Sequence, residues 1–143
     1  MDIQKQFAIL LHETARTWRQ EIDRRLKDYG LSQSKWRTLL CLDLSHDTLT
    51  QSELAHRLGI EDPTLVRTLD RLAKDGWVER KNDPGDRRSK TVHLTTKAHQ
   101  TLRYIHAAAD QVRHALLGNI SEKQLQSCID LFENIKHKAG TAT

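Results

Sequence analysis

Two short helical patterns, separated by only a few residues, constrain the fold of this 143-residue sequence more than any other feature. The segment Thr50-Gln51-Ser52-Glu53 fits a capping box, in which the Thr hydroxyl and the Glu carboxylate each satisfy a free backbone N–H group. The helix that follows ends at Gly59, because glycine tolerates the left-handed conformation of a helix C-terminus. Asp62 can cap the next helix, and Pro63 can occupy its first position. The pattern predicts two helices joined by a tight turn.

A β-hairpin is predicted directly after the second helix. Residues 77–80 and 90–94 are short segments suited to strands, and Asp83-Pro84-Gly85-Asp86 between them favours a type II turn. The order helix, turn, helix, hairpin is that of a winged helix-turn-helix. The predicted fold class is therefore mainly α, with a small β-hairpin as the wing.

Long amphipathic helices are predicted on both sides of this centre. Apolar residues recur three or four positions apart over residues 3–26, which indicates one long helix that ends before Gly30. Further helices are predicted over residues 32–44, over residues 95–117 and from residue 121 towards the C-terminus. About 25 helical residues span roughly 37 Å, which is more than the core of a small domain covers.

The apolar stripes of these flanking helices predict a second chain. We expect residues 1–31 and 96–143 to form dimerisation helices, because part of each stripe needs a partner to cover it. Residues 32–95 form the predicted winged helix-turn-helix region, and all three segments are expected to make one continuous unit. The predicted assembly is a homodimer.

Composition narrows the class of protein. The formal charge of +4 and a pI near 9.2 lean towards polyanionic partners without identifying one. Asp2, Lys5 and Glu13 interrupt every stretch where a signal peptide would need apolar residues, and no run of about 18 apolar residues predicts a membrane span. We therefore expect a cytoplasmic protein. Cys41 and Cys128 lie in apolar helical patterns and are predicted to be buried packing thiols.

No pattern in the sequence predicts catalysis. The six glycines are never closer than nine residues apart, so no phosphate-binding loop is present, and no Gly-x-Ser-x-Gly motif occurs. The eight histidines include no pair three or four residues apart, which is the usual helical spacing of zinc ligands. We expect a protein that is not an enzyme and that binds neither a metal nor a cofactor.

The second helix of the predicted motif carries a polar face with a distinctive composition. Four of its residues fall at positions i, i+3, i+4 and i+7: Thr64, Arg67, Thr68 and Arg71. Arginine can donate two hydrogen bonds to guanine O6 and N7, and threonine can contact a phosphate or a thymine methyl group. This face is therefore suited to the major groove of DNA. The alternative is an ordinary solvated helix face.

The predicted hairpin is basic at its tip. Its charged residues are five basic ones, against three acidic ones: Arg80, Lys81, Arg87, Arg88 and Lys90, against Glu79, Asp83 and Asp86. A narrow minor groove concentrates negative potential, which favours an arginine inserted there. We expect Asp86 to orient Arg88 internally, which leaves Arg87 freer to enter the groove. The alternative is a charged turn that is merely solvated.

Two segments resemble one known family. The run Asp86-Arg87-Arg88-Ser89-Lys90-Thr91-Val92-His93-Leu94-Thr95 is similar to the wing pattern of the MarR family, and residues 59–70 look like the recognition helix of its SlyA-like branch. The similarity extends from about Trp18 to the last helix. It implies a homodimeric transcriptional regulator whose terminal helices interlock, with two winged-helix lobes over successive major grooves of an AT-rich inverted repeat. By position, Arg67 matches the base-reading arginine and Arg87 matches the minor-groove arginine.

The resemblance also implies a small-molecule effector. Such regulators often respond to small aromatic carboxylates, such as salicylate, held between the dimerisation helices and the DNA-binding lobe. Arg19 and Trp36 match positions of that crevice, and Trp18 lies beside Arg19. An indole next to a guanidinium group suits an aromatic anion. The alternative for both tryptophans is a place in the core.

A second function remains open with the same fold. The winged helix could bind nucleic acid without sequence preference, or it could mediate a protein interaction. Binding to a random duplex and to an AT-rich inverted repeat at one salt concentration would separate these functions, since only an operator reader discriminates by several kcal/mol.

Overall fold

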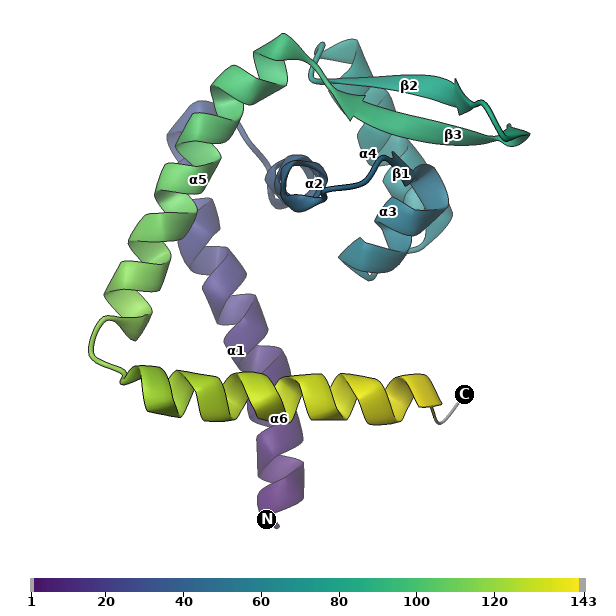
Figure 1. Ribbon diagram of the computed structural model, residues 1–143. Coiled ribbons are helices and arrows are strands. Elements are labelled where there is room, and N and C mark those ends of the chain that lie inside the picture. Colours follow the sequence, from purple (N-terminus) through teal and green to yellow (C-terminus); the bar gives the residue numbers. More distant parts are fainter. Residues whose placement is uncertain (1, 142–143) are drawn as a thin grey trace. The chain divides into compact units, whose positions relative to one another are not determined.

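The computed structural model describes residues 2–141 and confirms the mainly α fold with a small wing. The described residues form six α-helices, one short 3-10 helix and three strands, and Figure 1 shows how the helices and strands follow one another. In chain order they are α1 (Ile3–Leu26), η1 (Lys27–Tyr29), α2 (Gln33–Leu44), β1 (Leu49–Thr50), α3 (Gln51–Leu58), α4 (Asp62–Lys74), β2 (Val78–Asp83), β3 (Asp86–Leu94), α5 (Thr96–Leu117) and α6 (Glu122–Thr141).

The chain divides into two compact units, Met1–Val112 and Arg113–Thr143. The boundary between the two units lies inside α5. The reason is that the first part of α5 carries buried core residues, which include Leu102, Ile105 and Val112. The ring nitrogen Nε2 of His106 also lies 2.5 Å from Asp43 Oδ2 of α2. The start of α5 is therefore packed with the winged helix.

The predicted helix-turn-helix is present as α3 and α4. The capping box is confirmed, because Thr50 Oγ1 accepts a hydrogen bond from the Glu53 N–H and Glu53 Oε1 accepts one from the Thr50 N–H. Gly59 ends α3 with a positive φ of 68°. The predicted cap of α4 is wrong by one residue: the helix already includes Asp62, whose Oδ2 accepts a hydrogen bond from Ser52 Oγ.

The wing belongs to a three-stranded antiparallel sheet with the order β1-β3-β2 (Figure 1). The hairpin of β2 and β3 is longer than predicted, and its register is irregular between Asn82 and Asp83. The strand β1 was not predicted, because its two residues belong to the segment that starts α3. In β1, Leu49 pairs with Val92 and Thr50 pairs with Thr91.

One hydrophobic core joins the elements of the first unit. It takes buried apolar side chains from the end of α1, from α2, α3 and α4, from the sheet, and from α5. On α4, Leu65, Leu69 and Leu72 are fully buried. This inward face fixes how α4 is rotated, and so determines which of its residues face solvent.

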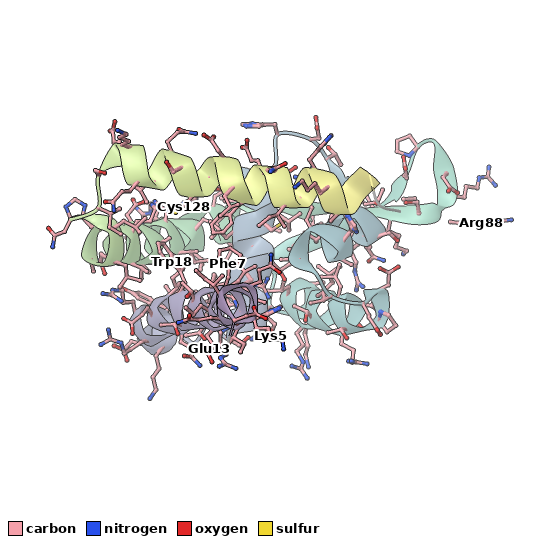
Figure 2. The ribbon with its side chains drawn as sticks, turned by 90° about the horizontal axis from the view of Figure 1, so that it is seen from below. Lys5, Phe7, Glu13, Trp18, Arg88 and Cys128 are labelled. Carbon is pink, nitrogen blue, oxygen red and sulfur yellow. The ribbon has the colours of Figure 1, made fainter. Side chains whose placement is uncertain are left out.

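The first part of α1 stands clear of that core. Its residues from position 3 to 17 are all exposed, and Ile22 and Leu26 are its buried residues. Exposed apolar side chains on this stretch include Ile3, Phe7 and Leu10, of which Phe7 is labelled in Figure 2. In the second unit, α6 likewise exposes large apolar side chains: Ile129, Leu131, Phe132 and Ile135.

Both cysteines are free thiols, and neither is fully buried. Cys41 on α2 is half-buried, whereas Cys128 on α6 is exposed (Figure 2). The prediction of a buried packing thiol is therefore wrong for Cys128. The apolar pattern around Cys128 was identified correctly. It did not give burial, because no residue of α6 up to position 140 is buried.

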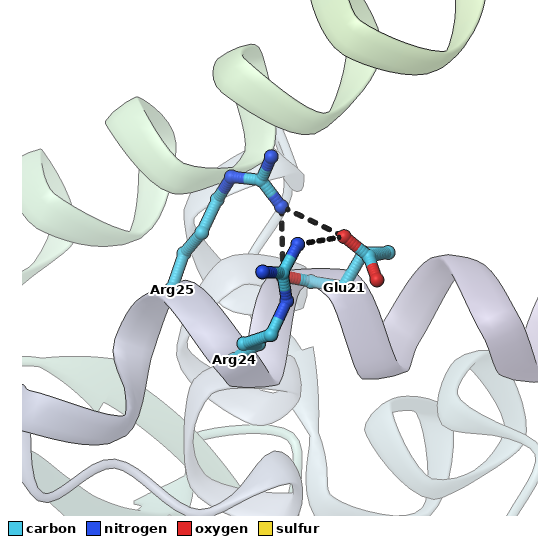
Figure 3. A network of polar contacts seen from close by, with 3 residues as sticks. All are labelled: Glu21, Arg24 and Arg25. Carbon is cyan, nitrogen blue, oxygen red and sulfur yellow. Dashed lines mark hydrogen bonds and ion pairs between the residues drawn. The ribbon is translucent and has the colours of Figure 1, made fainter.

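The last turns of α1 are joined by a small network of charges (Figure 3). Glu21 Oε2 lies 2.5 Å from Arg24 Nη2 and 3.1 Å from Arg25 Nη1. The hydrogen bonds from Arg24 and then from Arg25 lower the pKa of the Glu21 carboxyl group. These i, i+3 and i, i+4 pairs support the helix where it enters the core.

No helix over residues 2–141 is long and apolar enough to span a bilayer.

Gly59→Ala tests the turn between α3 and α4. A Cβ there would meet no heavy atom within 4 Å, so the expected cost comes from the backbone alone. We expect the free energy of unfolding, measured by chemical denaturation, to fall by about 1–2 kcal/mol, which is the cost of the left-handed conformation for an L-residue. Gly140→Ala is the control, because Gly140 is helical and should tolerate or favour alanine. Equal losses in both variants would contradict this explanation.

Candidate nucleic-acid interface

The outer face of α4 carries three of the four residues that the sequence placed there. Thr64, Arg67 and Arg71 are exposed, and Arg67 Nη2 donates a hydrogen bond to Thr64 Oγ1 at 3.4 Å. The buried leucines on the opposite side of the helix anchor it to the core. The face therefore presents two guanidinium groups and a hydroxyl to solvent from a helix that is held rigidly.

Thr68 does not lie on this face. Its side chain is 8% exposed, and its hydroxyl donates a hydrogen bond to the Thr64 carbonyl oxygen at 3.4 Å. The predicted position is wrong because residue 68 comes three residues after Leu65 and four before Leu72, which places it in the apolar stripe. Thr68 packs the helix and is not presented to solvent.

The wing presents Arg87, Arg88 and Lys90, all exposed, and the Arg88 side chain extends away from the hairpin (Figure 2). Asp86 Oδ1 accepts a hydrogen bond from the backbone N–H of Arg88 at 2.9 Å. The contact is thus to the main chain of Arg88 and leaves its guanidinium group unbound by Asp86. Among the described residues, neither Arg87 nor Arg88 has an acidic partner within ion-pair distance.

One basic residue of the hairpin is engaged inside the protein. Arg80 Nη1 of β2 lies 2.8 Å from Asp70 Oδ1 of α4. In the sequence, Arg80 is one of the basic residues of the predicted hairpin, and no pattern singles out Asp70. No spacing rule joins the two residues, because the nine residues between them leave a helix, pass through a turn and enter a strand.

A crevice of about 340 Å³ brings together the residues of the predicted effector site. Its lining includes Trp18, Arg19 and Trp36, as expected, and also Arg37, Cys41 and Arg57. Trp36 is 3% exposed, and its indole N–H donates a hydrogen bond to Asp23 Oδ1 at 2.5 Å. Trp36 is therefore a core residue with one edge on the crevice, and Trp18 is partly buried against the same core.

The crevice is positively charged. Arg19, Arg37 and Arg57 all line it, and within residues 2–141 none of the three has an acidic partner within ion-pair distance. The Arg19 Nε atom is buried without a hydrogen-bond partner, whereas Arg37 Nη2 donates to the Leu58 carbonyl oxygen at 3.2 Å. Burial, and then repulsion by Arg19, lower the pKa of Arg37. An anion with an apolar ring would suit this crevice, because its walls are aromatic and its guanidinium groups form no ion pair within residues 2–141.

The thiol of Cys41 on the wall of the crevice is not activated. Burial raises its pKa above the ordinary value, although Arg57 and Arg37 oppose this shift. At neutral pH the thiolate fraction is therefore smaller than for a free cysteine. Over the part of the chain that the structure describes, no three His, Cys, Asp or Glu side chains gather in a group that could hold a metal ion.

Known proteins share this architecture. Residues 31–90 match the family model described as MarR family. The crystal structure of transcriptional regulator PA3341 is 41% identical, covers 94% of this chain and 98% of its own, and superposes with a TM-score of 0.89. A MarR transcriptional regulator from Methanosarcina mazei Go1, 22% identical, covers 97% of this chain and 99% of its own with a TM-score of 0.83.

A further similar structure contains nucleic acid. Sco3205, a MarR family transcriptional regulator from Streptomyces coelicolor, was solved in complex with DNA. It is 25% identical, covers 96% of this chain and 89% of its own, and has a TM-score of 0.80. The family match over the winged helix, together with 41% identity to a transcriptional regulator over nearly the whole length, establishes that this chain belongs to the MarR family of transcriptional regulators.

Proposed function

We propose that this protein is a homodimeric transcriptional regulator that binds AT-rich inverted-repeat DNA in the cytoplasm. The observation that carries the proposal is the set of exposed arginines on α4 and the wing, which belong to one compact unit and have no acidic partner within residues 2–141: Arg67, Arg71, Arg87 and Arg88. Free guanidinium groups on a rigid scaffold are suited to phosphates and base edges. The similarity to Sco3205, which was solved with DNA, supports the same partner.

In this proposal α4 enters the major groove. Arg67 reads a guanine with two hydrogen bonds, while Thr64 and Arg71 contact the flanking phosphates or base edges. Thr68 takes no direct part, since its side chain is buried beside the leucines that set the rotation of the helix. A helix anchored by three buried leucines loses little conformational freedom on binding, which favours specific contacts.

The wing reads the shape of the adjacent minor groove. Arg87 inserts into the groove, and Arg88 and Lys90 contact the phosphates at its edge. Asp86 holds the backbone of the turn by its hydrogen bond to the Arg88 N–H, so its own charge is partly satisfied within the protein. AT-rich sequence favours this arrangement because a narrow minor groove has a more negative potential.

Two copies of the chain are needed to read an inverted repeat. The exposed apolar side chains of α1 and α6 support a homodimer, because a free monomer would leave them in water. A two-fold dimer places its recognition helices about 34–36 Å apart, which is one turn of DNA. The alternative function, binding to nucleic acid without sequence preference or binding to another protein, is an outcome of the first experiment below.

We further propose that an aromatic carboxylate such as salicylate binds the crevice of Trp18, Arg19 and Trp36. Its ring would contact the indoles, and its carboxylate would pair with Arg19, whose buried Nε lacks a partner. Arg37 connects the crevice to the helix-turn-helix, because its guanidinium group donates a hydrogen bond to the carbonyl oxygen of Leu58, the residue before the Gly59 turn. A carboxylate that attracts Arg37 would release this contact and loosen the turn that leads to α4.

Arg67→Ala and Arg87→Ala should weaken operator binding in different ways. We expect Arg67→Ala to cost about 1–3 kcal/mol and to relax the preference at one base position in each half-site. Arg87→Ala should weaken AT-rich sites most, because it reads groove width. Affinities for an AT-rich inverted repeat and a random duplex, at one salt concentration, measure both effects. Arg103→Ala on the exposed side of α5 is the control. Equal losses on both duplexes would favour binding without sequence preference.

Sedimentation at micromolar concentration should show a dimer. Phe7→Glu introduces a charge among exposed apolar side chains of α1 and should shift the protein towards monomer. Lys5→Glu is the control, since it also adds negative charge to α1, but at a position that is already polar. A wild-type protein that sediments as a folded monomer would contradict the two-fold reading of DNA.

Salicylate and operator DNA should weaken each other's binding by the same factor. A coupling of about 1–3 kcal/mol, or about 5- to 150-fold, is typical of such linked sites. Tryptophan fluorescence titrations with and without operator measure it. Arg19→Ala should reduce salicylate binding, and Arg37→Ala should reduce the coupling. Arg16→Ala, one turn earlier on α1 and exposed, is the control. Identical salicylate affinities with and without DNA would show that the crevice does not control DNA binding.

A further inference from the structure

Asp70 is an unexpected residue on the outer half of α4. It lies between Arg67 and Arg71 in sequence, and it is the one carboxylate between Arg67 and Lys74. Its side chain is 59% exposed, so burial does not hide its charge. A carboxylate on a helix that approaches DNA is repelled by phosphate. Its presence therefore needs a reason other than contact with nucleic acid.

The structure supplies a partner for Asp70. Arg80 Nη1 lies 2.8 Å from Asp70 Oδ1, and the Arg80 side chain is only 25% exposed. Arg80 is held at its backbone as well, because it pairs with Val92 of β3 in the sheet. The guanidinium group is therefore fixed by its own strand and by the helix, unlike the exposed arginines at the end of the wing.

This ion pair spans a junction in the chain. After α4 ends at Lys74, the main chain turns at Asp75 and Gly76, where φ is 80°, and enters β2 at Val78. Backbone hydrogen bonds hold the turn itself, as in the Trp77 N–H that donates to the Leu72 carbonyl oxygen. The Asp70–Arg80 contact joins helix and strand at a distance from this turn, so it restrains the angle between them.

We propose that the Asp70–Arg80 ion pair restrains the angle between α4 and the wing, and that it thereby increases the preference of the protein for an operator over random DNA. The inference rests on the proposed function, in which the helix and the wing occupy adjacent grooves of one duplex. Both can dock together only at one relative angle. Binding to random DNA depends mainly on phosphate charge and tolerates a range of angles. Asp70 and Arg80 are thus positioning residues.

The first test is Asp70→Asn, which keeps the shape and removes the charge. We expect the ratio of operator affinity to random-duplex affinity to fall by about fivefold, as suits a partly covered ion pair. Asp75→Asn is a matched control. It makes the same change near the end of α4, but Asp75 pairs with Lys35 of α2 at 3.5 Å and not with the wing. The control should leave the ratio unchanged.

Two further variants separate positioning from phosphate contact. Arg80→Gln should lower the same ratio while leaving the salt dependence of operator binding unchanged, since Arg80 touches no phosphate in the proposal. The double variant Asp70→Arg with Arg80→Asp restores the pair in reverse and should recover most of the lost preference. Thermal unfolding of every variant identifies any that fail to fold. If one of the single variants fails to fold, the affinity ratio is measured on the double variant with the reversed pair.

Two results would overturn the inference. Tighter binding of Asp70→Asn to operator and random DNA alike would show that Asp70 acts only by repelling phosphate. A weaker salt dependence of Arg80→Gln, with losses on both duplexes, would show that Arg80 contacts phosphate itself. Both results differ from a failure of the proposed function. If the proposed function fails, the wild-type protein itself binds operator and random DNA equally.

Discussion

The burial of one face of α4 is the interaction on which the rest of the DNA-binding surface depends. Leu65, Leu69 and Leu72 are fully buried, and each contributes about 2 kcal/mol from the area removed from water. An exposed ion pair contributes at most about 1 kcal/mol. The rotation of the helix is therefore decided by its leucines, and the charged residues occupy whatever face the leucines leave to solvent.

Much of this unit follows from short-range sequence rules. Thr50, Glu53 and Gly59 each act within four residues along the chain, through hydrogen bonds to nearby backbone groups or through a single backbone conformation. Such features depend little on the remainder of the fold, which is why the two helices and their turn were predicted correctly. The hairpin was predicted for the same reason, but the type II turn expected at Pro84 and Gly85 was wrong, because Gly85 does not have the positive φ that such a turn needs.

Features that depend on tertiary contacts were not predictable in this way. The strand β1 exists because Leu49 and Thr50 meet β3, some forty positions later in the chain. Thr68 was assigned to the wrong face because its polar side chain concealed its place in the apolar stripe. In the crevice, Arg37 and Arg57 come from two different helices, and only the folded chain brings them beside Arg19.

Thr50 has a double role whose consequence concerns how the fold can be altered. Its main chain pairs with Thr91 in the sheet, while its hydroxyl caps the first helix of the helix-turn-helix. The wing is consequently not structurally independent of the helix-turn-helix. A hairpin transplanted from a related protein as residues 78–94 alone would have to pair with a β1 strand to which it is not matched. Any misfit in that pairing would also disturb α3, because Thr50 of β1 caps this helix. The smallest segment that can be exchanged as a unit therefore begins at Leu49 and carries both DNA-binding elements together.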